Sequence, residues 1–74
     1  MKIDLTKIIF TQYDLDIIAE VILNALDKEG LTNDEIMEYW NKFPDDIKFD
    51  ALEYGVNDTV SRDSMYEWLQ ENCS

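Results

Sequence analysis

The chain has 74 residues, of which 46% are apolar and 12% aromatic, and its 17 acidic and 6 basic residues give a net charge of −11. This length predicts one domain over residues 1–74, and the apolar and aromatic content excludes a disordered acidic tail. The negative charge makes nucleic acid and anionic membranes poor partners, whereas a basic groove on another protein is a favourable one.

The residues that most often carry catalysis are scarce. The chain has no histidine, which removes the commonest general base near neutral pH. Its one cysteine, Cys73, has no histidine partner for nucleophilic catalysis. A glycine-rich phosphate loop cannot form with only Gly30 and Gly55. We therefore expect a protein that is not an enzyme and needs no cofactor.

Cysteine usage and hydropathy bear on where the protein works. A single cysteine cannot form an internal disulfide, so nothing indicates an oxidising compartment. The N-terminus reaches Asp4 before any long apolar run, unlike a signal peptide. No segment approaches the roughly 20 apolar residues that span a bilayer. We expect a cytoplasmic protein that makes no membrane contact.

The clearest periodic pattern predicts a helix over residues 12–29. Thr11 precedes it as a candidate N-cap. Apolar residues of this segment share one broad face, made of Leu15, Ile17, Ile18, Val21, Ile22, Ala25 and Leu26. So wide a face predicts a central helix that is covered on two sides. Gly30 is expected to end the helix in the left-handed conformation.

A capping box predicts the next helix, over residues 33–43. The Thr32 side chain is expected to accept a hydrogen bond from the backbone N–H of Glu35, the third helical residue. The Glu35 side chain is expected to accept one from the backbone N–H of Thr32. The helix then carries a bulky apolar face of Ile36, Met37, Tyr39, Trp40 and Phe43. Pro44 is expected to stop it, because the residue before a proline disfavours the helical conformation.

Pro44 also suits the first turn of a following helix, predicted over residues 45–54. Gly55 is expected to close that helix. Its buried face is expected to consist of Ile47, Ala51, Leu52 and Tyr54.

Turn-forming residues between Val56 and Val60 predict a loop. Ser61 is the candidate N-cap of a last helix over residues 62–72. This helix and the residue after it carry the apolar side chains Met65, Trp68, Leu69 and Cys73. Four helices joined by short connections predict an all-α fold, a compact bundle of four helices.

The N-terminal segment allows two interpretations. The alternation of Met1, Ile3 and Leu5 with polar residues suits a short extended arm. Asp4 could equally cap an additional short helix that runs into Phe10. Either one is expected to pack on the rest of the bundle.

Residues 27–38 superficially resemble a calcium-binding helix-loop-helix. Oxygen-bearing side chains fall at ligand positions of such a loop, namely Asp27, Glu29, Asn33 and Glu38. However, Leu31 lacks a side-chain oxygen, and Thr32 stands where the sharp turn needs glycine. The capping box explains the same residues, and no Cys/His cluster offers a zinc site. We expect no metal site.

Acidic residues recur three or four positions apart on the last three predicted helices. Residues at this spacing share a helix face, about 5–6 Å apart at Cβ. Splayed carboxylates on such rows can approach the spacing of phosphates along a nucleic-acid strand. The candidate partner-binding carboxylates, called the acidic rows below, are Asp34, Glu38, Asp45, Asp46, Asp50, Glu53, Asp63, Glu67 and Glu71.

Two aromatic residues lie outside the expected buried faces. Phe49 is off the apolar face of the helix after Pro44, and Tyr66 lies beside the apolar face of the last helix. Tyr, Trp and Phe are typical anchors of protein interfaces. Phe49 and Tyr66 are therefore the candidate aromatic anchors.

In overall character the chain resembles small acidic bacteriophage proteins that act against host defences, the anti-restriction and anti-CRISPR proteins that mimic DNA. The shared features are a short helical chain without histidine that is rich in Asp, Glu, Tyr and Trp. The resemblance covers the whole chain as a type and transfers no individual residue. It implies an inhibitor in the host-cell cytoplasm, often a homodimer, that fills the nucleic-acid groove of a nuclease, restriction enzyme or CRISPR effector.

A second hypothesis is a helical protein-interaction module, an adaptor or regulatory subunit, whose acidity serves only solubility. Its partner would dock on an exposed apolar patch around Trp40, Phe43, Phe49 or Tyr66. The two hypotheses differ in salt dependence, because screening weakens charge-driven binding.

Overall fold

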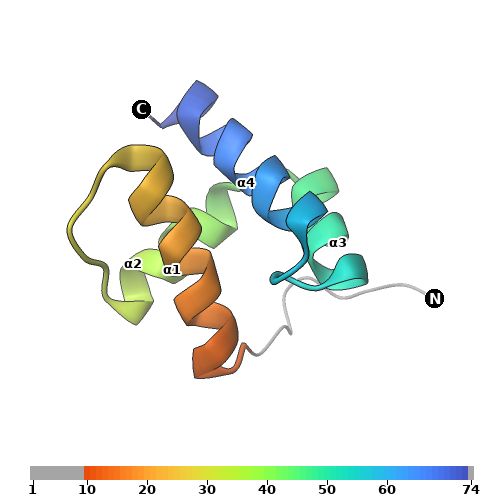
Figure 1. The fold of residues 1–74 in the computed structure, drawn as a ribbon, viewed down its shortest axis with the longest axis horizontal. Helices are drawn as coiled ribbons and strands as arrows, with labels where there is room; N and C mark the ends of the chain where they lie inside the picture. The colour runs from red at the N-terminus through yellow and green to blue at the C-terminus, as the bar shows by residue number, and fades with distance from the viewer. Residues whose placement is uncertain (1–9, 74) are drawn as a thin grey trace.

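The computed structural model describes residues 10–73 (Figure 1). These residues form four α-helices and no strand: α1 (Gln12–Leu26), α2 (Asn33–Lys42), α3 (Asp45–Tyr54) and α4 (Thr59–Asn72). The all-α bundle of four helices is thus confirmed. The short helix or arm expected at the N-terminus falls largely on residues 1–9, outside the described part of the chain. No helix of that part is long and apolar enough to cross a membrane.

Helix α1 is the central element, as the breadth of its apolar face predicts. It packs against α2 on one side and α4 on the other, and α4 packs in turn against α3 (Figure 1). The buried residues of α1 are Ile17, Ile18, Val21, Ile22 and Ala25.

The start of α1 is confirmed and its end is corrected. Thr11 and Asp14 form a capping box, in which the Asp14 N–H donates to Thr11 Oγ1 at 3.2 Å. The helix ends at Leu26 and does not reach residue 29. Asp27 takes the left-handed conformation expected of Gly30, with φ 54° and ψ 47°. An aspartate tolerates this conformation because its short side chain bonds locally.

Helices α2 and α3 begin and end close to the predicted positions. The capping box at Thr32 is present, with the Glu35 N–H donating to Thr32 Oγ1 at 3.2 Å and the Thr32 N–H donating to Glu35 Oε1 at 3.0 Å. Phe43 is extended, with ψ 142°, as the residue before a proline should be. Pro44 takes the N-cap position of α3, and Gly55 closes α3 at φ 95°.

The start of α4 differs from the prediction. The helix begins at Thr59, and Asp58 is its N-cap, whose Oδ1 accepts a hydrogen bond from the Val60 N–H at 2.9 Å. Ser61, the expected N-cap, is fully buried inside the helix. Its Oγ donates to the backbone oxygen of Asp50 at 3.1 Å and so ties α4 to α3. Both residues are good capping types, and the packing of α4 on α3 gives Ser61 a different partner.

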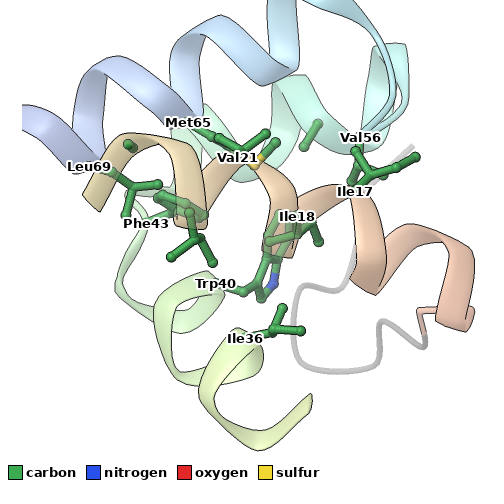
Figure 2. Close-up of a cluster of buried hydrophobic side chains, with 12 residues drawn as sticks. Ile17, Ile18, Val21, Ile36, Trp40, Phe43, Val56, Met65 and Leu69 are labelled. Carbon is green, nitrogen blue, oxygen red and sulfur yellow. The ribbon is translucent and has the colours of Figure 1, made fainter. Parts of the chain in front are cut away.

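All four helices contribute to one core (Figure 2). Trp40 lies at its centre, 1% exposed, with its ring edge-to-face against Phe10 at 4.8 Å and against Phe43 at 6.1 Å between centroids. The Phe43 ring also lies edge-to-face against the Trp68 ring, with 5.2 Å between their centroids. Offset and edge-to-face rings stabilise a core beyond the apolar area they bury.

One expected core residue is on the surface. Tyr54 was expected on the buried face of α3, but it is 56% exposed. It is the last residue of the helix, and Gly55 turns the chain directly after it. Val56 follows the turn and is buried in the core.

Candidate interaction surface

The structure places the acidic rows on the outside of α2, α3 and α4. Of their nine carboxylates, Asp50 is half-buried and the others are exposed. On α3, the buried Ala51 marks the side of the helix that faces the core. Glu53 lies two residues later and therefore roughly 200° around the helix axis, on the opposite side. Asp46 and Asp50 extend the row on the Glu53 side at the same three- and four-residue spacing.

Two of the rows lie on neighbouring helices and the third is separate. The row of α3 and the row of α4 belong to helices that pack against each other. The Asp34 and Glu38 pair belongs to α2, which packs chiefly against α1. The candidate surface therefore comprises the rows of α3 and α4, two helices that pack together, and a separate pair on α2.

The lysine side chains of residues 10–73 have neighbours other than these carboxylates. The ammonium groups of Lys28 and Lys42 lie 5.9 Å and 5.1 Å from the centre of the Tyr39 ring. Lys48 Nζ donates to the backbone oxygen of Asn41 at 3.3 Å. Within residues 10–73, no base lies at ion-pair distance from a carboxylate of the acidic rows. These carboxylates are therefore available to cations of a partner.

Arg62 forms an ion pair between two helices. Its guanidinium Nη2 lies 3.2 Å from Glu20 Oε1 and so joins α4 to α1. Both side chains are well exposed, at 41% and 60%, so the pair contributes little to folding. Its effect is to balance the charge of Arg62 locally.

The two candidate aromatic anchors are exposed, Phe49 at 40% and Tyr66 at 37%. Phe49 lies one turn from both Asp45 and Glu53 on the outer face of α3. The Tyr66 hydroxyl accepts a hydrogen bond from Gln70 Nε2 at 3.0 Å, which steadies its ring at the edge of α4. An aromatic side chain thus lies within or beside the acidic row on each of the two helices.

The exposure of four other aromatic side chains differs from what the sequence suggested. Trp40 and Phe43 are buried, so no exposed patch forms around them. Tyr13 and Tyr54 are exposed at 63% and 56%, although neither was singled out as a contact residue. Tyr13 follows the N-cap of α1 by two positions and Tyr54 ends α3, and residues at helix ends have fewer neighbours to cover them.

A groove between α1 and α4 is the feature that the sequence did not indicate. It has a volume of about 220 Å³ and is lined by Val21, Asn24, Thr59, Arg62, Asp63 and Tyr66. Asp63 and Tyr66 were candidate contact residues, and the other four were not. Helical periodicity describes each helix separately, so it carries no signal for a groove formed where two helices meet.

Within residues 10–73, the environment of Glu35 shifts the pKa of its carboxyl group. The backbone N–H and then the hydroxyl of Thr32 bond to its carboxylate and hold its pKa below the ordinary value of 4.5. The charge of Lys28 acts in the same direction, and partial desolvation opposes it. This carboxylate belongs to the cap of α2, so its lowered pKa reflects helix capping.

No group of three metal-ligating side chains gathers anywhere in residues 10–73. The calcium-like spacing of residues 27–38 has a structural explanation. Asp27 forms the left-handed end of α1, and Thr32 and Glu35 form the cap of α2.

No protein-family model, curated protein or solved structure matches this chain.

Proposed function

We propose that this protein is a non-enzymatic acidic inhibitor that mimics DNA and occupies the basic nucleic-acid-binding surface of a nuclease, a restriction enzyme or a CRISPR effector. The observation that carries the proposal is the pair of outward-facing acidic rows on the neighbouring helices α3 and α4. Within residues 10–73 these rows have no basic partner at ion-pair distance.

The spacing of the rows supports mimicry of a phosphate backbone. Residues four apart on a helix are separated by about 6 Å along its axis, and the long side chains of Glu67 and Glu71 can adjust this spacing further. A groove that binds nucleic acid presents lysine and arginine side chains to a row of phosphates. The same cations can pair with a row of carboxylates.

Charge and aromatic contacts would contribute differently to binding. Opposite charge across an interface mainly speeds association and sets specificity. A partly exposed aromatic side chain such as Phe49 becomes buried on binding and slows dissociation. The proposed inhibitor combines both on one face of α3.

The test is inhibition of DNA cleavage by a panel of nucleases, restriction enzymes and CRISPR effectors. We expect stoichiometric inhibition of at least one effector, relieved by excess duplex DNA and by added salt. The double variant Glu67→Lys/Glu71→Lys should weaken inhibition at least about tenfold, because several interface charge pairs become repulsive.

A matched control separates the row from net charge. Asp16→Lys/Glu29→Lys changes the net charge equally, at two exposed residues outside the rows. This control is expected to inhibit nearly as well as the unmodified protein. Equal loss in both double variants, or no competition with DNA for any effector, would contradict the proposal.

The second candidate is a protein-interaction module that binds through its exposed aromatic side chains. The exposure of Phe49 and Tyr66 favours it. It predicts binding that persists at high salt, survives Glu67→Lys/Glu71→Lys and is lost in Phe49→Ala or Tyr66→Ala. The inhibitor proposal predicts the opposite response to salt and to the charge variant.

A further inference from the structure

We propose that the groove between α1 and α4 accepts one arginine side chain of the basic partner. The inference rests on the proposed function, because it assigns part of the same acidic surface a specific ligand. It concerns a site formed by two helices, whereas the acidic rows lie along single helices.

The size of the groove suits a single side chain. Its volume of about 220 Å³ is below the roughly 300–1,000 Å³ of pockets that take whole small-molecule ligands. Val21 is buried and contributes an apolar wall. The methylene stem of a long side chain can pack against such a wall while its charged end stays near polar groups.

The groove also offers groups that suit a guanidinium. The Tyr66 ring lines it and is steadied by the hydrogen bond from Gln70, and aromatic rings attract cations over their faces. The Asp63 carboxylate and the Asn24 amide supply oxygen acceptors on the neighbouring walls. A guanidinium fits this set better than an ammonium, because it stacks flat on a ring and donates in a planar fork.

The charge balance of the groove favours a cation even though Arg62 lines it. Arg62 pairs with Glu20 at 3.2 Å, so its charge is balanced from within the chain. Asp63 has no base at ion-pair distance within residues 10–73. Glu67, one turn further along α4, is exposed and adds negative potential beside the groove.

The test is a titration of the full-length ¹⁵N-labelled protein with the peptide acetyl-Gly-Arg-Gly-amide, followed by NMR. The same peptide with lysine or with uncharged citrulline in place of arginine serves as comparison. We expect amide shifts concentrated at Asn24, Thr59, Asp63 and Tyr66. The lysine peptide should bind about fivefold more weakly, and the citrulline peptide should cause no saturable shift.

Variants on α4 locate the site. Asp63→Asn and Tyr66→Ala should weaken arginine binding about fivefold or more, whereas Tyr66→Phe should retain it because the ring remains. Glu29→Gln removes the same charge as Asp63→Asn at an exposed residue outside the groove and the acidic rows, and should leave binding unchanged. Asp63, Tyr66 and Glu29 are all exposed, so each variant is expected to fold, as its dispersed spectrum would verify.

Two outcomes would overturn the inference: shifts spread equally over all the acidic rows, or equal losses in Asp63→Asn and Glu29→Gln. Either would mean that arginine acts only as a diffuse counterion. The inhibition of DNA cleavage is measured separately, so a failure of the groove leaves the inhibitor proposal intact. Arginine binding in the groove without inhibition of any effector would instead contradict the proposed function alone.

Discussion

Ser61 has a polar side chain that is fully buried, although most buried residues within 10–73 are apolar. Its hydroxyl donates a hydrogen bond to the backbone oxygen of Asp50 at 3.1 Å. The sequence around it suggests an N-cap, because serine is a preferred capping residue. Asp58 takes that role, and Ser61 becomes the polar link between two packed helices. The type of a residue limits which hydrogen bonds its side chain can make. The neighbours of that side chain in the fold determine which of these bonds forms.

Ser61→Ala is expected to lower the free energy of unfolding by about 1 kcal/mol, the usual net contribution of one neutral hydrogen bond. Urea unfolding followed by circular dichroism measures this difference. Ser64→Ala, at a half-buried position one turn later on α4, serves as control and should change stability less. A Ser61→Ala protein as stable as the unmodified one would show that the bond to Asp50 contributes nothing.

Helix α2 owes its start to residues that are neighbours in sequence. Thr32 and Glu35 satisfy each other's backbone N–H groups without help from the rest of the fold. The same arrangement occurs at Thr11 and Asp14 at the start of α1. Such caps could be read from the sequence, whereas the end of α1 could not, because both Asp27 and Gly30 suit a left-handed residue.

The cap of α2 predicts a specific pH dependence. Glu35 has a pKa below its ordinary value of 4.5 in the folded protein, so its ionised form stabilises the fold. This contribution is complete above the unfolded pKa and is lost as the pH falls through the folded pKa. Glu35→Gln does not titrate. We therefore expect the unmodified protein to be more stable than Glu35→Gln at neutral pH and to lose that advantage as the pH falls below 4.5 and through the folded pKa.

Urea unfolding of both proteins at several pH values measures this difference. An NMR titration of the Glu35 carboxyl locates its pKa directly. A stability difference that stays constant across the acidic range would contradict the role assigned to the charged cap.

The whole molecule carries its negative charge evenly. Residues 10–44 and residues 45–73 each contain eight acidic and two basic side chains. With carboxylates exposed on every helix, the compact state is destabilised by self-repulsion. Binding to a basic groove would relieve this repulsion, because partner cations would neutralise the same carboxylates.

Salt is therefore expected to act in opposite directions on folding and on binding. Screening of the exposed charges should raise the thermal midpoint of the free protein as the ionic strength increases to about 0.1 M and above. The same screening should weaken inhibition of an effector. Calorimetry of the free protein and cleavage assays over one salt series measure both, with Asp16→Lys/Glu29→Lys as the control that should show the smaller thermal response. A thermal midpoint that falls with salt would contradict this account.

The sequence by itself determined the four helices, the capping box of α2, the N-cap residue of α1, the stop between α2 and α3, and the shared helix faces of the acidic rows. These features depend on residues within a few positions of one another, so helix periodicity and cap chemistry are sufficient to predict them. Only the tertiary structure decided that Ser61 bonds to Asp50, that Tyr54 lies on the surface, and that α1 and α4 enclose a groove. Each of these depends on which faces of distant segments meet, and that is settled by packing the apolar side chains of all four helices into one core.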